Sequence, residues 1–230
     1  MSVLVMQLAG PLQSWGAASR FARRSTENAP TKSGVLGLLA AAQGRRRTDD
    51  VSDLSRLRFG VRVDQPGVRL RDFQTAHHAD TGEPMPVSER FYLADAVFLA
   101  AVEGDDRLIS ELDRALWAPV FLPYLGRRSC PPAEPISRGI VRDSELEAVL
   151  RNHKWIASTW YQEKRKWEPT IELGAWIDAA PGERADHEIR DLPVSFDPAH
   201  RRYALRGQKH LTVRFPNPRG HDPIAALGGE

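Results

Sequence analysis

The sequence has little cysteine and no long apolar run. Its single cysteine, Cys130, excludes an internal disulfide and a zinc site made of several cysteines, and we expect it to be a small buried side chain. No apolar stretch approaches the roughly 18 residues of a membrane span. The N-terminal MSVLVMQLAGPLQ lacks the basic leader and long apolar stretch of a signal peptide. We therefore expect a cytoplasmic globular protein with no membrane contact.

Signatures of metal and nucleotide binding are also missing. None of the seven histidines stands in H-E-x-x-H, and no compact set of His, Asp, Glu and Cys has ligand spacing. Lys32-Ser33, in the stretch PTKSGVLGLLAAAQG (30–44), resembles the end of the phosphate loop G-x-x-x-x-G-K-[ST]. Thr31 precedes the lysine, however, and Glu27 stands in place of the first glycine. We expect no metal, no cofactor and no ATP or GTP site, although a helix start at Thr31 could still bind an anion.

Acidic residues are scarce near the N-terminus. Residues 1–47 hold seven Lys or Arg against the single Glu27, a net charge of +6, so the other 183 residues carry −4. A second basic tract lies at 198–221. Of the 32 basic residues 27 are Arg, which suits bidentate phosphate binding but is equally explained by genomic base composition. The clustering itself is the electrostatic footprint expected of a polyanion partner.

Apolar periodicity predicts the elements of the first hundred residues. In chain order these are a buried strand at 3–9, a polar connection at 11–29, a helix from the Thr31 cap to Gly44, a half-buried strand at 57–63, a long protruding hairpin at 65–90 and a buried strand at 91–102. Arg58 and Arg62 are expected on the outer face of the strand at 57–63.

A helix capped by Asp105 or Asp106 follows, with Pro119 just beyond it. The order strand, helix, strand, strand, helix is most of a βαββαβ unit. We therefore expect an α+β fold, with a ferredoxin-like (RRM-like) domain at 1–140 and the hairpin inserted as a thumb. Sheets of this kind are common RNA platforms. Residues 141–230 are expected to form a small β-rich C-terminal part, with a helix at 144–151 and strand-like runs at 154–161, 169–178, 187–196, 201–206 and 210–215.

Aromatic residues beside arginines mark two candidate RNA contacts. Trp15 and Tyr124 lie among arginines and could stack on unpaired bases. Four other tryptophans are interpreted as core: Trp117, Trp155, Trp160 and Trp176. In YLGRRSCP, Gly126 permits a tight turn that presents Arg127 and Arg128 together, with a solvated surface turn as the alternative.

The hairpin carries a third candidate contact. His77 and His78 fall near its tip, flanked by Arg69, Arg71 and Arg90, so it could touch a phosphate backbone or be merely solvated. A metal-free ribonuclease needs a general base, an acid and a cation, which His, Tyr and Lys can supply. All three residue types are present, but no spacing in the sequence brings them together.

Three segments together resemble the CasD family of CRISPR-associated proteins: LAGPLQSWG (8–16), PTKSGVLGLLAAAQG (30–44) and PYLGRRSCP (123–131). Each is weak alone, whereas their joint occurrence in this order and at these intervals is specific. The resemblance covers about residues 3–140.

The resemblance implies a ferredoxin-like domain with a thumb-like hairpin and a place in the type I-E Cascade surveillance complex. Members of the family hold the 5′ handle of the CRISPR RNA (crRNA), cap the foot of the backbone subunits and contact the large subunit that recognises the protospacer-adjacent motif. Target DNA would be reached only indirectly, through the complex. In a sister subtype the related protein cleaves precursor crRNA, whereas in type I-E a separate subunit does so.

We therefore expect a non-catalytic RNA-binding subunit that supports antiviral DNA surveillance. The Gln13–Arg24 loop, the Thr31–Ser33 helix start and the Tyr124–Ser129 turn are expected to line one groove, with the hairpin reaching a backbone subunit and RNA. The candidate RNA-binding residues are Gln13, Trp15, Arg20, Arg23, Arg24, Thr31, Lys32, Ser33, Arg69, Arg71, His77, His78, Arg90, Tyr124, Arg127, Arg128 and Ser129. The alternatives are a metal-independent endoribonuclease that processes precursor crRNA, and a structural protein that touches only other subunits.

Overall fold

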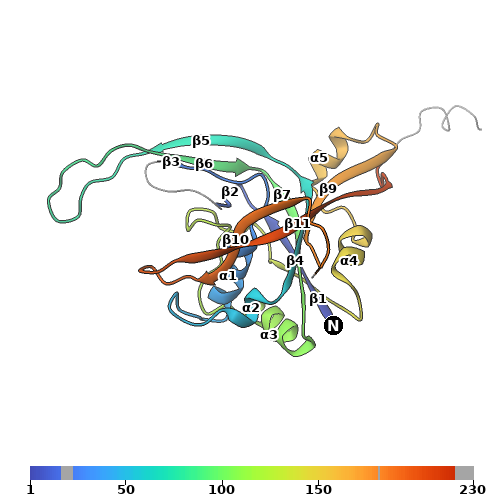
Figure 1. The fold of residues 1–230 in the computed structure, drawn as a ribbon. Coiled ribbons are helices and arrows are strands. Elements are labelled where there is room, and N and C mark those ends of the chain that lie inside the picture. Colours follow the sequence, from blue (N-terminus) through green and yellow to red (C-terminus); the bar gives the residue numbers. More distant parts are fainter. Residues whose placement is uncertain (17–22, 181, 221–230) are drawn as a thin grey trace, which may run out of the picture.

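A computed structural model describes residues 1–16, 23–180 and 182–220 of the chain (Figure 1). In chain order its elements are β1 (Ser2–Ala9), β2 (Leu12–Gln13), β3 (Arg23–Arg24), α1 (Lys32–Ala42), α2 (Ser52–Ser55), β4 (Arg58–Gln65), β5 (Val68–Gln74), β6 (Ser88–Ala94), β7 (Val97–Gly104), α3 (Asp106–Trp117), β8 (Ser137–Arg142), α4 (Leu146–Asn152), α5 (Thr159–Lys164), β9 (Thr170–Asp178), β10 (His187–Ser195) and β11 (Arg202–Pro216). No helix of these residues is both long and apolar enough to cross a membrane.

One antiparallel sheet of seven strands organises the molecule, in the order β10-β11-β9-β4-β7-β1-β8. The strands β9 to β11, which belong to the predicted small β-rich C-terminal part, extend this sheet because β9 pairs with β4. Helices α1 and α3 lie on one face and α4 lies on the other. The fold is therefore mixed α/β with a mostly antiparallel sheet.

Burial on both faces explains why β1 is apolar at nearly every position. Leu4, Met6 and Leu8 belong to the core beneath α1 and α3, while Val3 and Val5 belong to the core beneath α4. Side chains of a strand alternate between faces, so a strand covered on both sides appears as a continuous apolar run.

A smaller sheet is built around β6, which pairs with β5 along one edge and with β2 and β3 along the other. Pairing of β5 with β6 runs from Val68 opposite Ala94 to Gln74 opposite Ser88, and residues 75–87 form the tip. Every residue of β5 is exposed. Figure 1 shows this hairpin extending well away from the larger sheet.

Two helix starts agree with the sequence. Thr31 caps α1 by accepting a hydrogen bond from the Gly34 amide at 3.3 Å, and Gly44 follows the helix with a φ of +81°. Asp105 caps α3 by accepting from the amides of Arg107 and Leu108. A side-chain oxygen at the cap satisfies amides that have no partner within the helix.

Two predicted strands are wrong. The run at 91–102 is divided between β6 and β7 at Asp95, whose φ of +54° turns the chain from the smaller sheet into the larger one. The run at 154–161 is an irregular segment followed by α5. Its Trp155 Nε1 and Ile156 amide donate to the Asp64 carbonyl and carboxylate at 2.9 and 2.8 Å, so these groups do not serve a strand ladder.

Arg62 is also misplaced by the sequence pattern, which put it on an outer face. Its side chain is fully buried and forms a bidentate pair with Asp64, at 2.7 Å from Nε and 2.9 Å from Nη2. The same guanidinium donates to the carbonyls of Leu150, His153 and Lys154 at the end of α4. The reason is that α4 covers this face and supplies unpaired C-terminal carbonyls to a cation.

Candidate nucleic-acid interface

The predicted turn at 124–129 packs directly on the segment after β2. The Ser14 amide donates to the Leu125 carbonyl at 3.0 Å, and the Leu125 amide donates to the Cys130 carbonyl at 2.7 Å, which closes the turn. Gly126 has a φ of +86°, and a Cβ at this position would lie 1.7 Å from the Ser14 carbonyl oxygen. Only glycine permits this approach, so two segments more than 100 residues apart meet here.

Arg127 extends from this turn onto the smaller sheet. Its guanidinium lies over the Tyr92 ring at 4.6 Å, and its Nη2 donates to the Arg24 carbonyl at 2.9 Å. Arg24 in turn pairs with Arg90 in the parallel β3–β6 ladder. The Arg127 side chain therefore meets the backbone of β3, which is paired with β6 at Arg90. We call Arg24, Arg90 and Arg127 the arginine cluster.

The arginine cluster contains buried donors that other described residues do not satisfy. Arg127 Nη1 and Arg90 Nε are both buried, and neither has a hydrogen-bond partner within residues 1–16, 23–180 and 182–220. An unpaired buried donor on a charged group is costly. Both nitrogens are closed off from solvent, but Arg24 is exposed and Arg90 and Arg127 are half-buried. Phosphate oxygens are suitable acceptors for the accessible parts of these guanidinium groups.

The remaining residues of the turn border this cluster. Arg128 and Ser129 are exposed, and Tyr124 is half-buried. Cys130 is fully buried, as predicted, and burial raises the pKa of its thiol. A raised pKa disfavours the thiolate, so Cys130 is a packing residue rather than a nucleophile.

The hairpin arginines lie along β5. Arg69 Nη2 donates to the Thr26 carbonyl at 3.0 Å and to Asn28 Oδ1 at 2.8 Å, which ties the hairpin base to the loop before α1. Arg71 pairs with Glu89 and lies 4.6 Å above the Phe73 ring. The two hairpin arginines are thus already engaged by protein groups, although both remain exposed.

Both predicted hairpin histidines lie at the exposed tip. His77 makes an isolated bridge to Pro84, and His78 Nδ1 accepts from the amides of Asp80 and Thr81 at 3.3 and 3.4 Å. Of the other candidates, Arg20 lies outside the described residues, and Arg23 pairs through its backbone with Glu89 in the β3–β6 ladder. The described residues contain no group of three or more His, Cys, Asp or Glu placed to hold a metal ion.

Gln13 and Trp15 do not present their side chains to a ligand, which corrects the sequence assignment. Gln13 is fully buried and its Nε2 donates to the carbonyls of Leu8 and Ala96, while its Oε1 accepts from Trp15 Nε1 at 3.0 Å. Trp15 is 1% exposed. These two residues position the loop instead.

The assignment of the other tryptophans is partly reversed. Trp117 and Trp160, which were predicted to be core, are 63% and 56% exposed. Trp155 is buried and Trp176 is half-buried. Sequence alone could not separate these cases, because isolated aromatic residues are also common at surfaces.

The helix start at 31–33 is occupied by the protein's own carboxylates, so its predicted phosphate contact is corrected. All three residues are buried, and Thr31 Oγ1 is used as the cap. The Lys32 amide donates to Asp191 Oδ2 at 2.7 Å, and Lys32 Nζ lies 2.8 Å from Asp178 Oδ2. An anion does lie at this helix N-terminus, and it is the side chain of Asp191.

Arg206 completes a buried ion network with these residues. Its guanidinium binds Asp191 twice, at 2.6 and 2.9 Å, and Asp178 once, at 2.5 Å. Two cations and two anions thus balance in the interior. No sequence pattern indicates this network, since Asp178 and Asp191 lie 146 and 159 residues from Lys32.

The chain is similar over most of its length to known CRISPR-associated proteins. The family described as CRISPR-associated protein (Cas_Cas5) matches residues 3–207. The CRISPR system Cascade subunit CasD of Escherichia coli (strain K12) is 35% identical over 184 residues, which cover 71% of this chain and 82% of that protein.

Two solved structures share the fold at similar identity. One is described as a crystal structure of a Cas protein, with 36% identity, a TM-score of 0.72, and coverage of 96% of this chain and 98% of that one. The other belongs to a CRISPR RNA-guided surveillance complex, with 33% identity, a TM-score of 0.73, and coverage of 96% and 94%.

Proposed function

The chain belongs to the CRISPR-associated protein (Cas_Cas5) family, and on that premise we propose that it is a non-catalytic Cascade subunit that holds the 5′ handle of the crRNA. The observation that carries the RNA-binding part is the arginine cluster. Two of its three guanidinium groups keep a buried donor without a protein partner in the described residues. Arg24 is exposed and the other two are half-buried, so the cluster also offers positive charge at the surface. A phosphate backbone supplies anions at regular spacing.

The proposed fold class is a ferredoxin-like unit with an inserted thumb. The neighbours β4-β7-β1-β8 are antiparallel, and α1 and α3 stand in the two connections, as such a unit requires. The hairpin β5–β6 falls between β4 and β7 in the chain, where a thumb would be inserted. In this assignment β9 to β11 are an addition to one edge of the unit.

The hairpin is the proposed contact with a backbone subunit. It exposes five large apolar side chains, which is unusual for a hairpin facing only water: Val68, Leu70, Phe73, Met85 and Val87. Residues His77, His78 and Arg71 on the same hairpin are proposed to reach RNA between the two subunits. Contact with the large motif-recognising subunit is proposed from family membership alone.

Removing the two turn arginines is the direct test of RNA binding. Arg127→Ala with Arg128→Ala should weaken binding of labelled handle RNA by about tenfold or more, because each charge-assisted hydrogen bond contributes roughly 1.5–3 kcal/mol. The slope of log affinity against log salt should become shallower by about 0.7 for each phosphate that the variant no longer neutralises. Fluorescence anisotropy at several salt concentrations measures both quantities.

Arg107→Ala provides the matched control for that test, because Arg107 is an exposed arginine on α3 that pairs with Glu111 four residues away. It should leave the dissociation constant and the salt slope unchanged. If the double variant binds like the natural sequence, the site assignment is wrong, whatever the fate of the family assignment.

We expect no cleavage of precursor crRNA. Purified protein incubated with labelled repeat RNA in EDTA should leave the RNA intact at neutral and mildly alkaline pH. A metal-free ribonuclease needs a base, an acid and a cation around one phosphate. Lys32 is instead buried on Asp178, and His77 and His78 lie exposed at the hairpin tip. Alkali-treated RNA shows that fragments are detectable, and a single discrete protein-dependent product would favour the endoribonuclease alternative.

A further inference from the structure

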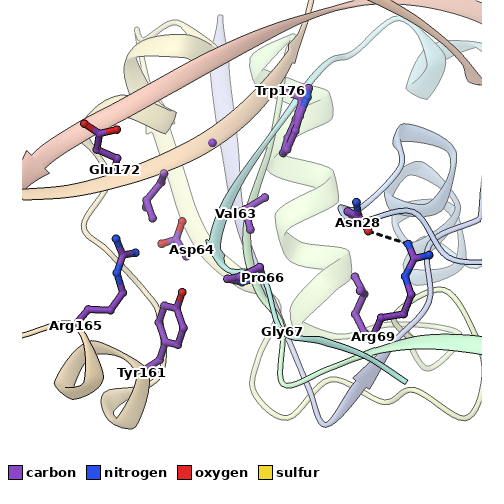
Figure 2. A pocket seen from close by; sticks show the side chains of 13 residues that line it. Asn28, Val63, Asp64, Pro66, Gly67, Arg69, Tyr161, Arg165, Glu172 and Trp176 are labelled. Carbon is purple, nitrogen blue, oxygen red and sulfur yellow. Dashed lines mark hydrogen bonds between the residues drawn. The ribbon is translucent and has the colours of Figure 1, made fainter. Parts of the chain in front are cut away.

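A pocket of about 540 Å³ opens at the base of the hairpin, and no residue of the arginine cluster lines it. Figure 2 shows Tyr161 and Arg165 on one side of it and Asn28 and Arg69 on the other. The first pair comes from α5 and the residue that follows it, and the second pair comes from the loop before α1 and from β5. Pockets of this size are large enough for a small ligand. The pocket therefore joins the hairpin to the C-terminal segment.

The walls of this pocket suit a flat, partly apolar group. Val63, Leu93 and Leu173 supply aliphatic surface, and the rings of Tyr161 and Trp176 supply aromatic surface. Trp176 is held edge-on against His210, at 5.2 Å between ring centroids, so its position is fixed by packing. Aromatic side chains of this kind are the usual platforms for unpaired bases.

The charges of the pocket leave one cation without a counter-charge. Three of its four charged lining residues pair with an opposite charge: Asp64 with Arg62, Glu172 with Arg214 and Arg165 with Glu168. The fourth, Arg69, donates to neutral groups, the Thr26 carbonyl and Asn28 Oδ1. Within the described residues it has no carboxylate partner. A ligand with one anionic group is therefore favoured at Arg69.

We propose that this pocket takes up one unpaired nucleotide of the bound RNA. Its base packs against Tyr161 and Trp176, its phosphate lies at Arg69, and the Asn28 amide group donates to the base edge. The inference rests on the proposed RNA binding, because Arg69 belongs to the same hairpin as Arg71 and to the sheet that carries the arginine cluster. The competing occupant is an apolar side chain of a neighbouring protein subunit.

An abasic scan coupled to pocket variants tests the proposal. Labelled repeat RNAs, each with one nucleotide replaced by an abasic residue, are titrated against the full chain. One position should weaken binding by about tenfold, in line with the stacking contribution of a single base. In Tyr161→Ala and Asn28→Ala, intact RNA should bind more weakly, and the same abasic position should then cost less than about twofold.

Trp117→Ala is the control, because Trp117 is 63% exposed, lies at the end of α3 and does not line the pocket. In this control variant, the abasic position should still weaken RNA binding by about tenfold, as in the natural sequence. Since Asn28 is exposed, Asn28→Ala keeps the test valid even if Tyr161→Ala unfolds, and thermal melting identifies that case.

The outcomes separate this proposal from the proposed function. The nucleotide pocket is overturned if no abasic position weakens RNA binding, or if the weakening at that position is unchanged in Asn28→Ala. Weaker RNA binding by Arg127→Ala would still support RNA binding by the arginine cluster in that case. Pocket variants that bind RNA normally but no longer co-purify with neighbouring Cascade subunits assign the pocket to a protein side chain instead. No RNA binding by the natural sequence, alone or with those subunits, rejects both proposals.

Discussion

Replacing Arg206 with alanine is expected to lower the free energy of unfolding by about 3–5 kcal/mol, the usual cost of removing one partner from a buried ion pair. The guanidinium makes three hydrogen bonds to Asp178 and Asp191, both almost fully buried. Without it, two carboxylates share the single remaining cation of the network, Lys32. Urea unfolding followed by circular dichroism measures the change, and Tm should fall by roughly 6 °C or more.

Arg214→Ala is the matched control for Arg206→Ala. Arg214 lies on the same strand, β11, and pairs with Glu172, but its side chain is 67% exposed. An exposed pair contributes about 0–1 kcal/mol. Arg206→Lys should recover only part of the loss, because an ammonium cannot reproduce the bidentate contact to Asp191. Equal effects of Arg206→Ala and Arg214→Ala would contradict the role assigned to the network.

This network makes the N-terminal helix depend on the C-terminal strands. Asp178 accepts from Lys32 Nζ and also from the Phe59 amide at the start of β4, while Asp191 occupies the start of α1. The loop that leads to α1 also carries Asn28, at the pocket, and Thr26, at Arg69. The C-terminal segment thus holds in place the elements from which the candidate RNA surface is built.

Features determined by near neighbours in the chain could be predicted from the sequence. The caps at Thr31 and Asp105, the strand β1 and the helices α1, α3 and α4 all follow from local hydrogen bonding and apolar spacing. The run at 91–102 failed because it is apolar at nearly every position, and its one charged residue, Asp95, does not by itself mark a turn. The segment at 154–161 failed because its polar groups bond to Asp64, 92 residues away.

The same distinction between near and distant neighbours decides which parts of the candidate site could be predicted from the sequence. A glycine beside two arginines indicated a turn at 124–129, and the structure brings Arg127 onto Arg24. Whether Lys32 faces solvent depends on Asp178 and Asp191, and whether Trp15 is exposed depends on how the loop packs under α1. Such burial is decided by residues distant in the chain, so composition and motif cannot reveal it.

Gly126→Ala is expected to weaken RNA binding by about tenfold or more without removing a charge or an RNA contact. The φ of +86° is strained for alanine, and the added Cβ would meet the Ser14 carbonyl oxygen at 1.7 Å. That oxygen belongs to backbone and cannot rotate away, so the turn must shift and Arg127 must leave Tyr92. The free energy of unfolding should fall by more than about 3 kcal/mol, the upper range for substitutions that strain the backbone.

Gly182→Ala isolates the steric part of this effect. Gly182 has nearly the same φ, +82°, but a Cβ there meets no atom within 4 Å. It should cost about 1–2 kcal/mol from backbone strain alone and leave RNA affinity unchanged, since it lies in the connection between β9 and β10. At temperatures below its own melting transition, the Gly126→Ala protein is folded, and its affinity for handle RNA should still be reduced. If it binds handle RNA with normal affinity under those conditions, the turn at Gly126 does not position Arg127 for RNA binding. The proposed role of the arginine cluster would then be contradicted.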